Sequence, residues 1–323
     1  FKMLPAVETT STTIVSQSGG TVYTKSWHHR LLKQDDNDYE WNDCEAFHSS
    51  KVPVTLLICF CGLVGNGAVL WFLGSHVRQN PITVYVLNRA VADFAFLLSV
   101  VAALGIFYGP ESLCHRLGSQ SVTTALNMSI LFTFTASVYL LAAFSATTSL
   151  ALLSPFHWLC HPSWLLPVLL CALLWVLSFL LTFTLYFCPA ALMIFILSYF
   201  LSLMTLILSG LILLSRLFCS SRQCSPRRLC LVVLLAIFFF PFLTADLVYW
   251  LLLRLFDSSA FVLKISLPLA CTNSAVNPLI YFLVGSCAKK FTLSPRVAFQ
   301  RILEDVTEPQ NRGITPRENT VET

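Results

Sequence analysis

The sequence has few charged side chains, and they are unevenly placed. The 20 basic and 16 acidic side chains make up 11% of 323 residues, against roughly 25% in an average soluble domain. Residues 117–215, which are 99 in all, contain no Lys, Arg, Asp or Glu. A water-soluble fold needs surface charge over such a length. A soluble enzyme, a nucleic-acid-binding protein, a disordered protein and a secreted disulfide scaffold are therefore all disfavoured.

The sequence also lacks the local motifs of catalysis and of cofactor binding. It has no P-loop, no HExxH zinc motif, no CxxC pair and no nucleophile elbow. Most of the 12 cysteines lie in apolar runs, where a free thiol behaves as a small hydrophobic group. Only Cys44, Cys114 and Cys188 fall where an oxidising exterior could reach them, and an odd number leaves at least one unpaired. We expect a protein that is not an enzyme and has no cofactor.

Seven apolar runs are each long enough for a membrane-spanning helix, which needs about 20 residues. The runs are apolar on all sides, and the alternation typical of a transmembrane β-barrel is absent. Cys188-Pro189 separates the fourth run from the fifth. The sequence predicts an all-α membrane protein, a seven-transmembrane helix bundle followed by a short amphipathic helix. The expected spans are 52–75, 81–108, about 121–153, 164–187, 190–218, 229–256 and about 259–284.

Lys and Arg near the span ends predict the orientation, because they are enriched in cytoplasmic loops. One set of loops carries nine of them and the other four, which places the C-terminus inside. Residues 1–50 are then an extracellular, disordered tail, rich in acids between Asp35 and Glu45. Residues 51–285 form the transmembrane domain. Residues 286–323 form a cytoplasmic amphipathic helix and tail, in which Cys287 is a candidate palmitoylation site.

Polar residues inside three of the spans form a pattern. The first span contains Asn66 after Gly65, the second contains Asp93, and the last contains Asn277-Pro278-Leu279-Ile280-Tyr281. Each is costly in lipid unless it bonds inward. In this order and on these spans, they resemble the rhodopsin-like (class A) G-protein-coupled receptors. Residues 65–72, 80–93, 277–286 and 297–305 resemble the Mas-related branch of that family.

The resemblance implies a multi-pass plasma-membrane receptor with an extracellular ligand, a heterotrimeric G protein and the lipid bilayer as partners, and no nucleic acid. It also implies that a polar network sets the switch between states. Pro241 in the sixth span resembles the hinge of the family, and Phe239 is our candidate for the aromatic switch residue beside it. The network would comprise Asn66, Asp93, Asn273, Asn277, Pro278 and Tyr281.

Two departures from the family pattern bear on function. The third span of family members ends in an acid followed by the Arg that meets the G protein, and here these positions are Thr147 and Thr148. In addition, Arg89 stands where the family has an apolar residue, four residues before Asp93 and on the same helix face. It either extends to the headgroups or pairs with Asp93. We favour the first alternative, whereas the second would displace the sodium ion that the family holds there.

The candidate ligand site is in the outer part of the sixth span. Asp246 is the only acid in the outer half of the third to sixth spans, so it could attract a cationic ligand. Alternatively, it pairs with Arg254 near the surface. Tyr249 and Trp250 suit either a pocket wall or an interfacial aromatic belt. The leading hypothesis is a Mas-related receptor for a cationic or amphipathic peptide or small molecule. The rival is a receptor fold with weakened or lost coupling, serving as a decoy, a partner-binding protein or a degenerate receptor.

Overall fold

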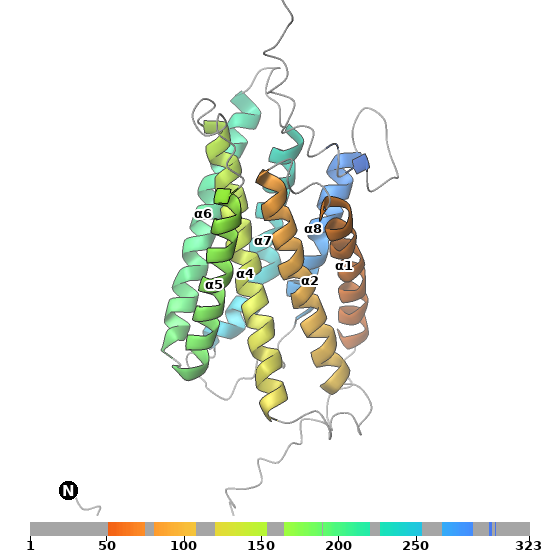
Figure 1. Ribbon diagram of the computed structural model, residues 1–323, viewed down its shortest axis with the longest axis vertical. Helices are drawn as coiled ribbons and strands as arrows, with labels where there is room; N and C mark the ends of the chain where they lie inside the picture. The colour runs from red at the N-terminus through yellow and green to blue at the C-terminus, as the bar shows by residue number, and fades with distance from the viewer. Residues whose placement is uncertain are drawn as a thin grey trace, which may run out of the picture. The chain divides into compact units, whose positions relative to one another are not determined.

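The computed structural model describes seven helices of the chain (Figure 1). It describes residues 51–74, 81–107, 120–153, 165–188, 190–219, 227–253 and 267–286, together with 297, 298 and 301, all within the unit Asp43–Thr323. Over this part of the chain the regular structure is helical throughout. The helices are α1 (Lys51–Gly74), α2 (Pro81–Phe107), α4 (Gln120–Leu153), α5 (Leu165–Phe187), α6 (Ala191–Cys219), α7 (Arg227–Leu253) and α8 (Pro268–Ser286).

Six of these helices are long and apolar enough to cross a membrane, namely α1, α2, α4, α5, α6 and α7. The described part of α8 is 19 residues long and carries Thr272, Asn273, Ser274 and Asn277, which make it less apolar. Large apolar side chains cover the outside of the bundle, for example Trp71 at 82% exposure and Val64 at 74%. Exposed apolar area of this extent, on helices of this length, is typical of a surface that faces lipid. The predicted all-α membrane helix bundle is confirmed, with six of its described helices apolar enough to cross a membrane.

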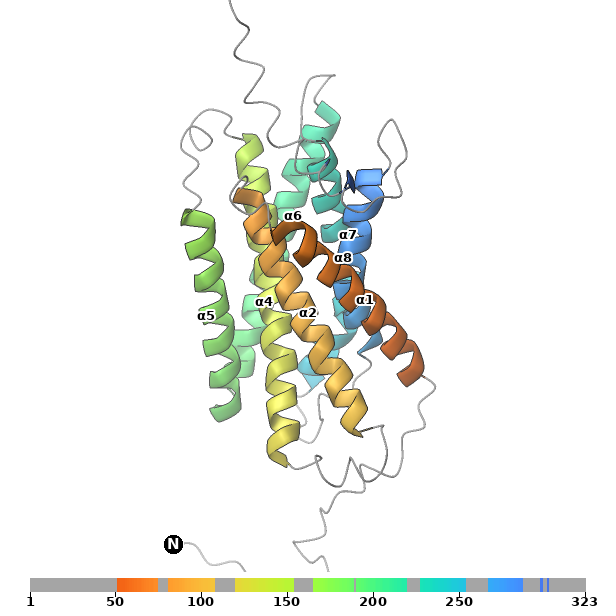
Figure 2. The ribbon, with the colours of Figure 1, turned by 45° about the vertical axis from the view of Figure 1, so that its right-hand side comes forward.

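The helix α4 lies at the centre of the bundle (Figures 1 and 2). It packs against α2, α5 and α6, and 72% of its most apolar stretch is buried inside the protein, against 22% of the corresponding stretch of α5. On the other side, α8 packs against α1, α2 and α7. Thus α2 lies between the two halves, and a side chain on its inward face can reach both α4 and α8.

Two apolar clusters fill the interior, one on each side of a polar layer. On α2, residues up to Ala92 belong to one cluster and residues from Phe96 onward belong to the other. Asp93 lies between them. On α8, Cys271 belongs to one cluster and Ile280 to the other, so that Ser274 and Asn277 fall between. The fold therefore concentrates polar side chains in one layer that crosses α2 and α8.

Four arginines lie at one end of the bundle, which we call the basic end. It is the end where α6 finishes, α7 begins and α8 finishes. Its arginines are Arg216 on α6, Arg227 and Arg228 on α7, and Arg301, whose carbonyl is bonded by Arg228.

Candidate functional site: a polar network between α1, α2, α4 and α8

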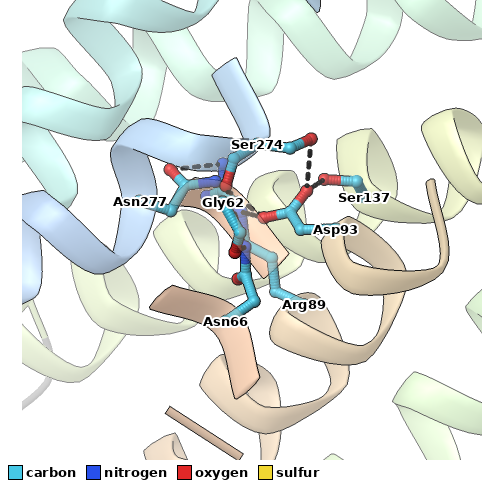
Figure 3. A network of polar contacts seen from close by, with 7 residues as sticks. All are labelled: Gly62, Asn66, Arg89, Asp93, Ser137, Ser274 and Asn277. Atoms are coloured by element: carbon cyan, nitrogen blue, oxygen red, sulfur yellow. Dashed lines mark hydrogen bonds and ion pairs between the residues drawn. The ribbon is translucent and has the colours of Figure 1, made fainter. Parts of the chain in front are cut away.

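Asp93 is at the centre of the polar layer and has no exposed surface. Its Oδ1 accepts hydrogen bonds from Ser137 of α4 at 2.7 Å and Ser274 of α8 at 3.0 Å. Its Oδ2 accepts a hydrogen bond from Nδ2 of Asn277, also on α8, at 2.7 Å. Figure 3 shows these three side chains converging on the carboxylate. A single buried acid thus holds α4 and α8 to α2, as a buried charge requires partners.

Arg89 lies beside Asp93 inside the bundle, with 2% of its surface exposed. Its Nε is 3.7 Å from Oδ2 of Asp93, and its Nη2 donates to Oδ1 of Asn277 at 3.0 Å. The prediction that Arg89 extends to the headgroups is therefore wrong. Four residues of helix place both side chains on one face. The attraction between the Arg89 guanidinium and the buried Asp93 carboxylate therefore outweighs the hydration that Arg89 would gain by extending to the headgroups.

The carboxylate of Asp93 does not fit the sodium ion that the family resemblance implies. The Arg89 guanidinium already neutralises this carboxylate, and the two oxygens of Asp93 accept three hydrogen bonds. Within the described residues, Nε and Nη1 of Arg89 lack a hydrogen-bond acceptor. The site therefore has surplus donors, which repel a second cation.

Asn66 of α1 completes the network at the proline break of α8. Pro278 removes the donor that would serve the carbonyl four residues earlier, which is that of Ser274. Nδ2 of Asn66 donates to this carbonyl at 3.1 Å and to the carbonyl of Gly62 at 2.9 Å. A Cβ on Gly65 would lie 3.0 Å from the Pro278 ring, so glycine lets α1 approach closely enough for this bond.

Asn273 and Tyr281, the remaining predicted network members, are buried on α8. Tyr281 lies in the apolar cluster nearer the basic end, with Arg89 and Asp93 close enough to act on it electrostatically. Sequence reasoning missed Ser137 and Ser274. Several hydroxyls in these helices simply bond the preceding turn, as Thr135 does, so the residue type alone is no signal.

The aromatic beside Pro241 that faces the interior is Phe240 and not Phe239. Phe239 is 38% exposed on the outside, whereas Phe240 is 1% exposed. The Phe240 ring stacks on Tyr199 of α6 at 6.0 Å, and the Tyr199 hydroxyl lies 2.9 Å from Oγ1 of Thr244. One residue turns a helix by about 100°, so a prediction off by one position selected the lipid face.

The remaining predicted residues are not part of the network where the structure describes them. Asp246 is half-buried on α7. Tyr249 and Trp250 belong to α7, but their side chains, Arg254 and Cys287 lie outside the described residues. Thr148 is buried and donates to the Phe144 carbonyl at 2.8 Å. Thr147 is half-buried, close to the Tyr85 hydroxyl of α2.

Of the three cysteines that an oxidising exterior was predicted to reach, Cys188 is exposed and carries a free thiol. Cys44 and Cys114 lie outside the described residues.

Several relatives of the chain are receptors of one family. It is 32% identical over 300 residues to Mas-related G-protein coupled receptor member A2B of Mus musculus, covering 84% of this chain and 95% of the relative. Member X2 of Homo sapiens is 32% identical over 305 residues, or 84% of this chain and 88% of the relative.

A third relative extends this similarity over almost the whole chain. Member B4 of Mus musculus is 30% identical over 325 residues, or 93% of this chain and 98% of the relative. No family model matches the chain. This level of identity extends over most of the length of several relatives, and six described helices are apolar enough to cross a membrane. The chain therefore belongs to the Mas-related G-protein-coupled receptors and is a membrane receptor, not an enzyme.

Proposed function

We propose that this receptor lies in the plasma membrane with its basic end in the cytoplasm and that it activates a heterotrimeric G protein there. The observation that carries the proposal is the network around Asp93. It joins α1, α2, α4 and α8 through direct bonds and through the break at Pro278. A rearrangement of α8 at this break would change the bonds to three other helices at once. Two-state elements of this kind underlie receptor switching.

The helix α7, which is the sixth span, would supply the movement. Pro241 lies inside it and leaves a hinge there. Directly before it, the Phe240 ring packs on Tyr199 of α6, and just beyond it Thr244 lies at hydrogen-bond distance from the Tyr199 hydroxyl. Arg227 and Arg228 begin the helix, on the same side of Pro241 as Phe240. Swinging the basic end of α7 outward about Pro241 would open that end to a G protein.

A second candidate function is supported by Thr147 and Thr148. Threonine carries no charge, and the Thr148 side chain is buried and bonds its own helix. It therefore offers a partner at the basic end no cation. The chain would then keep the receptor fold and bind partners or ligands without coupling to a G protein.

Thr148→Arg separates the two candidates. With the network intact, we expect this variant to raise ligand-free nucleotide exchange on a panel of Gα subunits several-fold over the native chain at equal surface expression. Ser215→Arg adds the same charge at an exposed position on α6, and it is expected to change nothing. If neither the native chain nor Thr148→Arg promotes exchange on any Gα subunit, the second candidate is correct.

The ligand proposed is a cationic or amphipathic peptide or small molecule that enters opposite the basic end. Within the described helices, Asp93 and Asp246 are the only acids, and Asp93 is occupied by Arg89. A half-buried carboxylate on α7 is therefore the anchor available to a cation.

We expect Asp246→Asn to lower the potency of cationic peptides tenfold or more in a screen on surface-expressed receptor. Asp246→Glu should restore most of that potency, because it returns the charge. A peptide equally potent on the native chain and on Asp246→Asn would exclude this anchor for that peptide.

A further inference from the structure

A short part of the chain beyond α8 packs on the bundle. Val297, Ala298 and Arg301 are helical in the structure. Ala298 has no exposed surface, whereas its neighbour Val297 is 37% exposed. An alanine is covered on all sides only when backbone or side chains of other elements pack against it. These three residues, which we call the C-terminal segment, therefore have a docking surface.

The docking surface begins at the end of α8. A Cβ built on Gly285 would overlap the carbonyl oxygen and lie 2.6 Å from the carbonyl carbon of Ala298. No side chain fits between the two backbones, because such distances are never seen for a real Cβ. Gly285 is thus the residue that permits the C-terminal segment to lie directly on α8.

The other part of the docking surface is the first turn of α7. Nη1 of Arg228 donates to the backbone carbonyl of Arg301 at 3.1 Å. Arg228 is half-buried there, while Arg227 beside it is exposed. The C-terminal segment consequently bridges α7 and α8 at the basic end. These two helices must part there if α7 swings about Pro241.

We propose that the C-terminal segment is a built-in competitor of the G protein for the basic end, holding α7 against α8 until it is displaced. This inference rests on the proposed function, which assigns the G protein to that end. Opening α7 breaks the Arg228–Arg301 bond, and insertion of a partner helix beside α8 displaces Ala298 from Gly285. A tethered competitor acts at high effective concentration, so even a small contact area suppresses basal coupling.

The first test measures docking without any signalling. In full-length receptor in lipid nanodiscs, Ala298→Cys and Val297→Cys are labelled with a polar maleimide, and the labelled site is located by peptide mass. We expect Ala298→Cys to react at least tenfold more slowly than Val297→Cys. Adding Gly285→Leu should remove the difference. Adding Gly74→Leu should preserve it, because a Cβ at Gly74 meets nothing within 4 Å.

The second test measures competition as binding of nucleotide-free G-protein heterotrimers to the same nanodiscs. We expect Gly285→Leu and Arg228→Gln to raise binding threefold or more, with Gly74→Leu unchanged. Arg228→Gln keeps the test decisive where Gly285→Leu fails to fold. Each substitution is also combined with Thr148→Arg.

Three results would overturn the proposal, and they are distinguishable. Equal labelling of the two cysteines in the otherwise native receptor shows that the segment is not docked. Release of Ala298→Cys by Gly285→Leu with no gain in binding, while Thr148→Arg does bind, shows docking without competition. Binding by no variant, Thr148→Arg included, defeats the proposed function and the competition with it, and the labelling still reports whether the segment docks.

Discussion

Replacing Arg89 by Met is expected to destabilise the receptor more than any other single change in the polar layer. The substitution keeps the apolar volume of the stem but leaves the Asp93 carboxylate buried without its counter-charge. Removing one partner of a buried pair typically costs about 3–5 kcal/mol. We expect a clearly lower thermal midpoint for the purified receptor, measured by intrinsic fluorescence. Arg216→Met, at an exposed position on α6, should leave the midpoint unchanged.

The double variant Arg89→Met/Asp93→Asn should recover most of the loss. It removes both charges, and it also removes the two guanidinium nitrogens that lack acceptors within the described residues. Replacing a whole buried pair is often neutral or stabilising, so the coupling energy of the double-mutant cycle should be large. A double variant no more stable than Arg89→Met would show that the two side chains do not interact.

The same pair predicts that the native receptor is indifferent to sodium. Its thermal midpoint should be equal in sodium chloride and in choline chloride of the same ionic strength, because Arg89 already neutralises Asp93. Agonist affinity should be equally insensitive. A native receptor stabilised by sodium over choline would contradict the placement of the guanidinium.

Phe240→Ala is expected to have the second-largest effect, and Phe239→Ala is its matched control. Both delete the same ring one residue apart on α7, but Phe240 is buried against Tyr199 while Phe239 faces outward. We expect about 2–3 kcal/mol for Phe240, below the loss typical of soluble cores, because lipid is as apolar as the interior and only packing is lost. Phe239→Ala should stay within about 0.5 kcal/mol.

The two phenylalanine variants should also differ in signalling. Phe240 joins α6 and α7 beside the proposed hinge at Pro241, so its loss should change ligand-free nucleotide exchange on Gα. Equal effects of the two variants on the thermal midpoint and on exchange would show that neither ring is part of the hinge.

The helix bounds could be predicted closely from the sequence. The first five helices begin and end within one residue of the expected spans, as α2 does at Pro81 and Phe107. A helix in lipid must satisfy its own backbone, so it extends as far as the apolar run does. The positions of Asn66, Asp93 and Asn277 followed for the same reason, because a polar group inside such a run has few alternatives to an inward bond.

The partners of these residues could not be predicted, because they depend on which faces of different helices meet. Arg89 has the length to reach either the headgroups or Asp93, and only the packing of α2 against α8 places Asn277 within its reach. Ser137 resembles the other hydroxyls of α4 until α2 brings the Asp93 carboxylate to it. Phe239 and Phe240 are chemically the same, and the rotation of α7 alone decides which one is buried.

Hydrophobic length and motif order are local properties of the chain, and they were enough to predict an all-α membrane protein that resembles the Mas-related receptors. The packing of the helices settles how the buried charge is neutralised, which aromatic lies beside the proposed hinge, and where the C-terminal segment docks. Each of these depends on contacts between residues far apart in the chain, such as Asn66 with Ser274 and Arg228 with Arg301. A step of one residue along a helix is enough to turn a side chain from the lipid to a protein neighbour.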